Sequence, residues 1–401
     1  MSSSKPLEIA VPITTTSSRY VPPSMAAEQA AMLHASGLVD YVQTYDQISG
    51  FFPRSLWDPK NAPLAAGLSD IDSQHDPFAL STYVLAHNPE AGLICSTDAV
   101  RRGPVELAQT LLSWSTMTTG KVMLQMGAGE VRQLSPGGWK RTWGLPRLED
   151  QLKMFHALWE AADTPANLEG NTWNLNNAYL GGQRSAHRPA LWTLGGGPKL
   201  IDLTTTYADG VNVAIPAVQS YADEYGDWID TVQAQVASKD RDPDSFAFGG
   251  WPVMLIHEDE NVIDRALDNP LIRWVAAIWG RFNNREWARE GVESVFPEDW
   301  HYSVKFRPMA TSAAETDEVI SRTTRKMAEK ALLWGTPAQL ADQLQPFIDR
   351  GVSWLSLTDF LPIVLEAEDA AQWPQRTLEL ARLLKNAQTP AALTVSAAHA
   401  T

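Results

Sequence analysis

Glu130 follows a predicted strand at residues 121–126 and the glycine-rich turn Gly127-Ala128-Gly129. An acidic side chain at the carboxyl end of a parallel strand faces the mouth of an α/β barrel, where a carboxylate can exchange a proton. The two glycines let the backbone approach a flat ring or a ribityl chain, because no Cβ stands in between. The alternative is a solvated carboxylate on an ordinary turn, since Gly-x-Gly turns are common.

A second turn, Gly195-Gly196-Gly197-Pro198, follows a short apolar run at residues 190–194. Free backbone N–H groups at the start of a helix bind anions without the help of a basic side chain. The turn is therefore a candidate phosphate site. The alternative is a tight strand-to-helix turn in which Pro198 takes the first helical position.

The elements that must position these turns alternate along the chain. Residues 93–95 form an apolar run, Pro104 opens a helical pattern, and Gly120 ends that pattern before the next run. Parallel strands bring their carboxyl ends together at one rim of a sheet, where α/β proteins bind ligands. Roughly eight strands, each followed by a helix, predict an α/β fold, a (β/α)8 barrel in one domain over residues 1–401.

Three segments depart from this alternation. A mostly helical, tryptophan-rich insertion is expected at residues 258–330, within the barrel domain. The two ends of the chain, residues 1–6 and 386–401, are expected to be mobile tails. The insertion and the aromatic loop around Phe51 and Trp57 are expected to cover an apolar or aromatic small-molecule substrate.

Composition narrows the function classes. The formal net charge of −15 disfavours nucleic acid as a partner, because phosphate binding needs a basic surface. No run approaches the roughly 20 apolar residues of a membrane span, and the first residues lack the apolar core of a secretory signal. Cys95 is the only cysteine and the eight histidines show no paired spacing, so we expect no metal site. A cytoplasmic protein is predicted.

Several short motifs together resemble the luciferase-like monooxygenase superfamily, within the branch that uses the deazaflavin coenzyme F420 and includes ketoreductases. The motifs are Ile94-Cys95-Ser96-Thr97-Asp98 with Arg101-Arg102-Gly103-Pro104, Thr119-Gly120-Lys121, Gly127-Ala128-Gly129-Glu130, Tyr45-Asp46-Gln47 with Pro53-Arg54-Ser55, Gly197-Pro198-Lys199 with Tyr207-Ala208-Asp209-Gly210, and Gly335-Thr336-Pro337. They are spread over most of the chain. The resemblance implies the (β/α)8 fold and a homodimer.

The resemblance also implies roles for particular residues. A non-prolyl cis peptide between Ile94 and Cys95 would lie behind the deazaflavin ring, and Thr97 would hydrogen-bond the ring. Such a bond costs about 3 kcal/mol and persists only where the surrounding structure enforces it. The alternative is a plain buried strand with a core cysteine. Further cofactor contacts are implied for Asp46, Gly127, Ala128, Gly129, Gln133 and the turn Gly195, Gly196, Gly197 and Pro198, with Glu130 as the candidate proton donor.

Gln47 departs from the family pattern. Members of this branch commonly carry Asp-His where this chain has Asp46-Gln47, and the histidine moves a substrate proton. Glutamine donates and accepts hydrogen bonds but exchanges no proton near neutral pH. Gln47 could orient a carbonyl and Asp46 could orient the site. The proton would then come from Glu130, His75 in the long loop, a tyrosine or ordered water.

The leading hypothesis is an F420-dependent oxidoreductase that transfers a hydride between the deazaflavin and a ketone- or enone-type substrate, with reduction favoured. The second is a monooxygenase that uses reduced FMN on the same fold. The third is a barrel that binds flavin or F420 without turnover, because the usual histidine is missing. Only the cofactor and its turnover separate the three.

Overall fold

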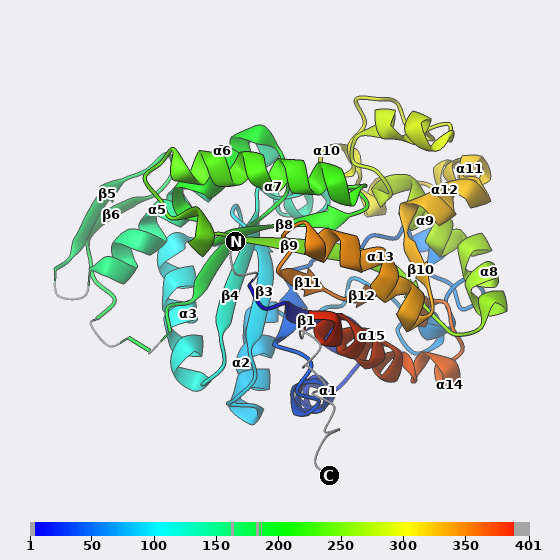
Figure 1. Ribbon diagram of the computed structural model, residues 1–401, viewed down its shortest axis with the longest axis horizontal. Coiled ribbons are helices and arrows are strands. Elements are labelled where there is room, and N and C mark those ends of the chain that lie inside the picture. The colour runs from blue at the N-terminus through cyan, green and yellow to red at the C-terminus, as the bar shows by residue number, and fades with distance from the viewer. Residues whose placement is uncertain (1–4, 162–163, 182–183, 186, 389–401) are drawn as a thin grey trace, which may run out of the picture.

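Eight parallel strands close into a barrel in the computed structural model, which describes residues 5–161, 164–181, 184–185 and 187–388. Each strand pairs with its two neighbours, and the register of the last pair, Ile9 opposite Leu355, closes the ring (Figure 1). The strands in barrel order are β1 (Glu8–Pro12), β2 (Tyr41–Tyr45), β3 (Leu93–Asp98), β4 (Val122–Gly127), β7 (Ala190–Leu194), β8 (Gly210–Ile215), β9 (Ala247–Ile256) and β11 (Trp354–Ser356). The prediction of a (β/α)8 barrel is confirmed.

The barrel helices lie outside the strands and cover them (Figure 1). Several begin with proline, whose missing N–H costs nothing at the first helical position. They are α1 (Pro23–Ala35), α2 (Pro77–His87), α3 (Pro104–Met117), α4 (Val131–Leu134), α5 (Gly144–Glu160), α6 (Pro198–Tyr207), α7 (Ala222–Ala237), α13 (Pro337–Asp349), α14 (Ala367–Ala370) and α15 (Trp373–Gln388). Among the described residues, no helix combines the length and the apolarity that crossing a bilayer requires.

A helical segment between β9 and α13 lies on one side of the barrel, and a two-stranded hairpin lies on the other (Figure 1). The hairpin consists of β5 (Ala166–Glu169) and β6 (Asn174–Ala178). The segment contains α8 (Glu260–Asp268), α9 (Pro270–Trp279), α10 (Tyr302–Lys305), α11 (Ala313–Arg322) and α12 (Arg325–Ala331). We call residues 258–330 the insertion. It packs its apolar helix α9 against the barrel, and eight of the ten α9 residues are buried.

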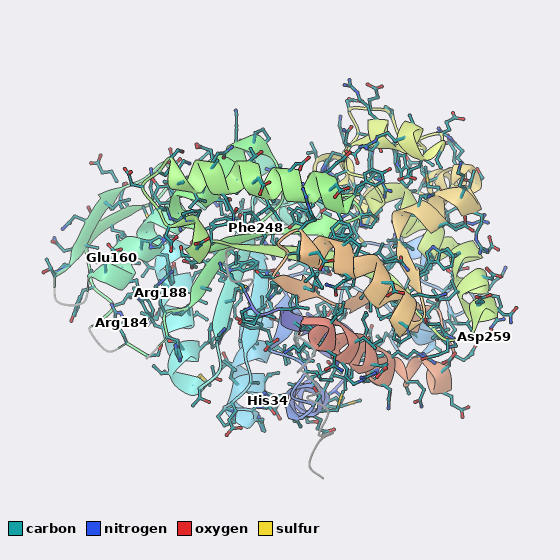
Figure 2. The ribbon with its side chains drawn as sticks, in the orientation of Figure 1. His34, Glu160, Arg184, Arg188, Phe248 and Asp259 are labelled. Carbon is teal, nitrogen blue, oxygen red and sulfur yellow. The ribbon has the colours of Figure 1, made fainter. Side chains whose placement is uncertain are left out.

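Strand β9 connects the barrel to the insertion. Its first half pairs with β8 and β11, and its second half continues beyond them to pair with β10 (Leu333–Gly335) and β12 (Thr358–Asp359). On the outer face of β9, Phe248 is buried against Trp228 of α7, whereas His34 and Asp259 lie at the edge of the molecule (Figure 2). The extended strand β9 therefore connects the insertion directly to the barrel wall.

The barrel interior is layered. Its lowest layer is apolar and contains Ala10, Tyr41, Ile94, Met123, Trp192 and Trp354. The two indoles fit because β9 carries a glycine beside them. A Cβ on Gly249 would lie 2.7 Å from the Trp192 ring and 2.8 Å from the Trp354 ring. This layer closes the barrel from below, so a ligand can enter only from the carboxyl ends of the strands.

The predicted tails fall largely outside the described residues. Residues 1–4 and 389–401 are not described, so their predicted mobility is not tested. Helix α15 runs to Gln388, three residues into the predicted second tail.

Candidate active site

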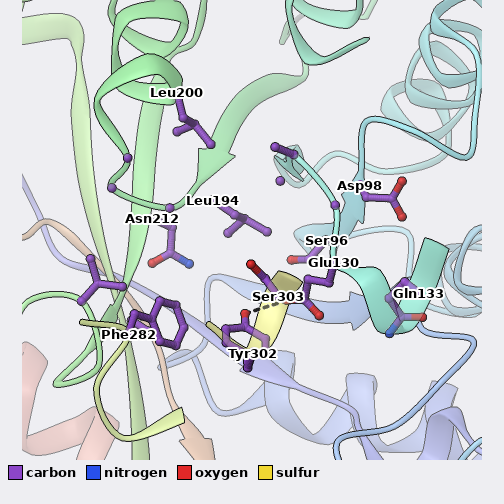
Figure 3. Close-up of a pocket in the computed structure, with 18 of the residues that line it drawn as sticks. Ser96, Asp98, Glu130, Gln133, Leu194, Leu200, Asn212, Phe282, Tyr302 and Ser303 are labelled. Carbon is purple, nitrogen blue, oxygen red and sulfur yellow. Dashed lines mark hydrogen bonds between the residues drawn. The ribbon is translucent and has the colours of Figure 1, made fainter. Parts of the chain in front are cut away.

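A cavity of about 1040 Å³ opens at the carboxyl ends of the strands. Barrel strands and their loops form one wall, and the insertion forms the other (Figure 3). From the barrel, the lining includes Gln43, Tyr45, Asp46, Gln47, Ser96, Thr97, Gln125, Gly127, Ala128, Gly129, Glu130, Gln133, Gly195, Gly196, Gly197, Pro198 and Asn212. From the insertion, it includes Trp279, Phe282, His301, Tyr302 and Ser303. The structure thus brings most of the predicted residues to one cavity.

The floor of the cavity is a network of buried amides and hydroxyls. The Gln43 amide donates to Ser96 Oγ at 2.9 Å and accepts from Ser356 Oγ at 2.5 Å. Ser96 donates to Gln125 Oε1 at 3.2 Å, and Asn212 Nδ2 donates to the same oxygen at 3.5 Å. The Asn212 Oδ1 atom is buried and has no partner among the described residues. An unpaired buried amide oxygen costs free energy, and a ligand N–H that reached this atom from the cavity would offset that cost.

Asp46 is fixed by hydrogen bonds and two arginines at the end of β2. Its carboxylate accepts a hydrogen bond from Thr97 Oγ1 at 2.7 Å and pairs with Arg101 at 3.2 Å and Arg102 at 3.3 Å. Its side chain is 2% exposed. The Thr97 hydroxyl proton is therefore used by Asp46, which leaves Thr97 only an acceptor for a ligand. Asp46 therefore links the carboxyl end of β2 to that of β3 through Thr97.

The predicted cis peptide between Ile94 and Cys95 is wrong. Among the described residues the one cis bond is Ile215–Pro216, and β3 runs regularly through Asp98. Strand alternation explains the difference. Ile94 points into the apolar layer below the cavity, and Cys95 points outward into the core shared with the helices. Neither residue lines the cavity, and the side chain of this strand that reaches its floor is Ser96.

Glu130 accepts hydrogen bonds on both carboxylate oxygens. Arg132 Nε donates to Oε2 at 2.6 Å, and the Tyr302 hydroxyl donates to Oε1 at 2.7 Å (Figure 3). Burial, together with the charge of Glu130, raises the pKa of Tyr302 well above its ordinary value. Both carboxyl oxygens of Glu130 are therefore already used as acceptors by neighbouring side chains. The arrangement suits an acceptor better than the predicted proton donor.

His301 precedes α10 and its ring is held by that helix. The Nδ1 atom accepts from the Ser303 backbone N–H at 3.2 Å. In a neutral imidazole the proton is then on Nε2, which makes no hydrogen bond to a described residue. Burial lowers the pKa of His301, and the nearby Arg141 charge lowers it further while Glu130 opposes this. His301 is thus a neutral donor at the cavity.

Gln133, Gln47 and His75 differ in their placement. The Gln133 amide oxygen accepts from the backbone N–H groups of Ile48 and Ser49, and its nitrogen donates to Ser49. Gln133 therefore holds the loop after β2. Gln47 lines the cavity from that loop. His75 lies outside the cavity lining, with its backbone N–H bonded to Ser17, so it is not placed to move a substrate proton.

The turn between β7 and α6 presents backbone to the cavity. Gly195 has φ +120°, in the region that favours glycine, and its N–H is used by Asn212 O. Gly197 is the N-cap of α6, and a Cβ there would meet nothing within 4 Å. The cavity side of this turn is therefore open, and Lys199 stands beside it in the lining. The helix N-terminus and this lysine together suit a phosphate.

Aromatic side chains cover the opposite wall. Trp279 contacts Trp251 at a ring-centroid distance of 4.8 Å and Phe51 at 5.4 Å, and Phe282 contacts Tyr302 at 4.9 Å. Phe51 thus joins the wall as expected. Trp57 lies instead on the side of the insertion, outside the cavity lining. The wall is suited to an apolar or aromatic body.

The sequence pattern does not single out Arg132, Arg141 or His301, and it includes Tyr302 only among the tyrosines. Arg141 comes from the short helical turn η5 (Arg141–Trp143) after α4. His301 and Tyr302 come from an irregular part of the insertion, about 170 residues from Glu130 in sequence. No spacing marks these residues. The density of aromatic residues around them is the one signal that pointed to this region.

Comparisons with known proteins agree with the geometry. The sequence profile of the family described as luciferase-like monooxygenase matches residues 61–353. The phthiodiolone/phenolphthiodiolone dimycocerosates ketoreductase of Mycobacterium kansasii is 25% identical over 344 residues, 84% of this chain and 91% of that protein. The corresponding ketoreductase of Mycobacterium tuberculosis H37Rv is 23% identical over 344 residues, covering 84% of this chain and 88% of the relative.

Solved structures share the fold at low identity. An F420-dependent secondary alcohol dehydrogenase in complex with an F420-acetone adduct has a TM-score of 0.69 and 16% identity, covering 94% of this chain and 99% of that one. The EDTA monooxygenase of Chelativorans sp. BNC1 has a TM-score of 0.61 and 16% identity, covering 97% and 96%. The fold is therefore shared by F420-dependent enzymes and by monooxygenases.

Proposed function

Because the chain belongs to the luciferase-like monooxygenase family, we propose that it is an F420-dependent oxidoreductase that reduces a ketone-type substrate. The observation that carries the proposal is the buried, unpartnered Asn212 Oδ1 in the polar floor of a cavity that also has an open glycine turn. A deazaflavin has a polar ring edge with an N–H donor, and a phosphate on its side chain. The two features match these two ends of the cofactor.

The residues of this chain would divide the work between cofactor and substrate. Asn212, Gln125 and Ser96 would hold the polar ring edge, and the turn of Gly195 to Pro198 would hold the phosphate. When bound, the deazaflavin supplies a hydride to the substrate carbon. The aromatic wall would hold the apolar body of the substrate and aim that carbon at the ring.

Gln47 and Glu130 shape the proton chemistry. Gln47 lines the cavity and can donate a hydrogen bond to a carbonyl oxygen but cannot release a proton to it. Glu130 accepts hydrogen bonds from Arg132 and Tyr302 on its two oxygens. We infer that Glu130 keeps the Tyr302 hydroxyl in place at the cavity and that the substrate oxygen receives its proton from water. Glu130→Gln is the direct check of this role.

The test is an absorbance titration of the full chain with F420 and with FMN, followed by anaerobic transfer from reduced F420 to a panel of ketones. We expect F420 to bind more tightly than FMN and its oxidation to depend on a ketone. Tight FMN binding with oxygen-dependent turnover would show a monooxygenase instead. F420 binding without transfer to any ketone would show a barrel that binds the cofactor without turnover.

Two matched variants test whether F420 binding depends on Asn212 Oδ1. Asn212→Leu removes the free acceptor, so F420 binding should weaken about tenfold, the usual effect of losing one buried hydrogen bond to a ligand. Asn283→Leu also lies on the cavity lining, but on the insertion side, and should leave the cofactor affinity within about twofold. Equal losses in the two variants would show that Asn212 makes no special contact.

A further inference from the structure

The wall around Glu130 carries one positive charge that no described residue compensates. Glu130 and Arg132 pair with each other at 2.6 Å. Arg141 also lines the cavity, but it forms neither an ion pair nor a side-chain hydrogen bond with a described residue. Its Nε atom is buried without a partner. Burial lowers the pKa of the Arg141 guanidinium, and the charge of Glu130 opposes this effect without cancelling it.

An uncompensated, partly buried guanidinium destabilises the protein that carries it. Arginine cannot escape this cost by losing its proton. An unpaired buried charge is therefore expected where a ligand supplies the opposite charge. The other buried arginines near the cavity show the contrast, because Arg101 and Arg132 both have a carboxylate partner.

His301 carries a second unused donor on the lining of the same cavity. The neutral His301 ring has its Nδ1 occupied by Ser303 and its Nε2–H free. Burial lowers the pKa of His301, the charge of Glu130 opposes this, and the charge of Arg141 lowers the pKa further. They come from different elements, η5 and the residue before α10, and both line the same cavity. One guanidinium and one N–H donor thus line the same cavity, and neither has an acceptor among the described residues.

We propose that Arg141 and His301 form a carboxylate-binding subsite for the substrate. The identification of this ligand as a substrate rests on the proposed function. A planar guanidinium matches a carboxylate in a bidentate pair, and the single surplus charge matches a monoanion.

The position of the subsite separates it from the cofactor. The candidate phosphate turn is at Gly195 to Pro198, after β7. Arg141 and His301 instead border the aromatic wall, where the His301 ring lies 5.0 Å from the Phe282 ring. The substrate class is therefore an aromatic or alkyl keto acid, with its apolar body on the wall and its carboxylate at Arg141.

The test compares benzoylpropionate with its methyl ester, two ketones that differ in the carboxylate charge. Binding to the full chain is measured by calorimetry, with and without F420. We expect the acid to bind about tenfold more tightly than the ester. Arg141→Gln should abolish this preference and leave the ester affinity unchanged. Equal affinities of the wild-type protein for acid and ester would overturn the proposal.

Three controls make the result specific. Arg285→Gln removes one positive charge from an exposed position of the insertion, with 73% of its side chain exposed, and should leave the preference unchanged. His301→Asn keeps an acceptor for the Ser303 N–H but removes the Nε2 donor, so the preference should fall. His301→Gln restores an N–H at the Nε2 position and should recover it. Loss of the preference in Arg285→Gln, or no loss in His301→Asn, would contradict the assignment.

Stability and cofactor binding provide independent readouts. Because the Arg141 charge is uncompensated, Arg141→Met should raise the Tm of the ligand-free protein, whereas Arg132→Met should lower it. F420 and its phosphate-free riboside should both bind the Arg141→Gln variant as they bind the wild-type protein. Weaker binding of F420 alone would assign the anion to the cofactor and overturn the proposal. If no ketone is reduced but the acid preference depends on Arg141, the proposed function fails and the subsite stands.

Discussion

The barrel wall and the insertion wall of the cavity satisfy their polar groups differently. On the barrel wall, Asp46, Thr97 and Gln133 are all engaged by neighbouring residues. On the side that faces the insertion, Arg141 and His301 keep donors that no described residue uses. The barrel wall is therefore largely built before any ligand arrives, with Asn212 Oδ1 left unpaired among the described residues of its floor, whereas the other side is completed by a ligand.

This difference separates two tasks. A wall whose polar groups are mostly paired with one another can hold a cofactor in one orientation, because its geometry changes little on binding. A wall with aromatic rings and unpaired donors selects what is placed against the cofactor. Substitutions in the barrel wall should therefore cost stability, and substitutions in the insertion wall should change ligand selection.

The largest expected effect is at Asp46, on the barrel wall. Asp46→Asn removes the negative charge that faces the buried Arg101 and the half-buried Arg102. Arg101 keeps Asp98 and Arg102 keeps Asp76 in the variant, so the cost should not exceed about 3–5 kcal/mol, the value for breaking a buried ion pair by removing one partner. Urea denaturation should show this loss. As a control, Glu298→Gln breaks an exposed pair with Arg285 and should cost less than about 1 kcal/mol. Similar losses in both variants would contradict the contrast.

The pH dependence of stability tests Asp359, which lies on β12 beside the part of β9 that leads into the insertion. Burial raises its pKa from 3.8 to about 7, and its Oδ2 atom has no partner among the described residues. The folded state therefore holds a proton that the unfolded state has lost between about pH 4 and pH 7. The stability that depends on this proton is present below pH 4, falls as pH rises to 7, and amounts to about 4 kcal/mol at most.

The check for Asp359 is the pH dependence of unfolding. Wild-type protein should be less stable at pH 8 than at pH 5, and Asp359→Asn should reduce that difference because an amide does not ionise. Asn also keeps the oxygen that accepts from the Ile256 and Leu361 backbones. An unchanged difference in the variant would assign the pH dependence to other groups.

Gly249 tests the packing beneath the barrel wall. Gly249→Ala places a methyl group against Trp192 and Trp354 at distances shorter than van der Waals contact. Overpacking of a closed core costs about 1–3 kcal/mol. Thermal denaturation measures this loss. Gly67→Ala is the matched control, since its Cβ would meet only a backbone oxygen at 3.9 Å, and it should be nearly neutral. A neutral Gly249→Ala would show that the indole layer can shift.

Phe282 on the insertion wall should give the smallest change in stability. The residue is only partly buried, so Phe282→Leu should cost within about 1 kcal/mol. Its ring borders His301 and Tyr302, so the affinity for an aromatic ketone should fall instead. Calorimetric titration with the ester probe measures this change. A large loss of stability with unchanged affinity would remove the distinction between the two walls.

The sequence predicted what depends on local order. A strand followed by a glycine turn and a proline-initiated helix is a local pattern, so Glu130 and the turn at Gly197 could be placed at the barrel mouth in advance. The cis form of the Ile94–Cys95 peptide bond, in contrast, is implied only by the resemblance to a family. The alternation of β3 shows that Ile94 lies one layer too low and that Cys95 faces outward.

His301, Tyr302 and Arg141 could not be predicted because tertiary packing brings them to the cavity. Tyr302 reaches Glu130 from a four-residue helix in an irregular segment, where no periodicity defines a face. The unpaired state of Arg141 is also invisible in sequence, since it depends on which carboxylates lie near it in space.

The pairing of β1 with β11 has a consequence for synthesis on the ribosome. The strand that begins at Glu8 cannot fill its open edge until Trp354 to Ser356 have left the exit tunnel. Until then one edge of β1 is unpaired in the nascent chain. Four of its five residues are buried in the folded protein, so this free edge can pair with other chains. Closure of the barrel is therefore a late folding event, because β1 and β11 are far apart in sequence. Chains truncated before Trp354 should be prone to aggregate.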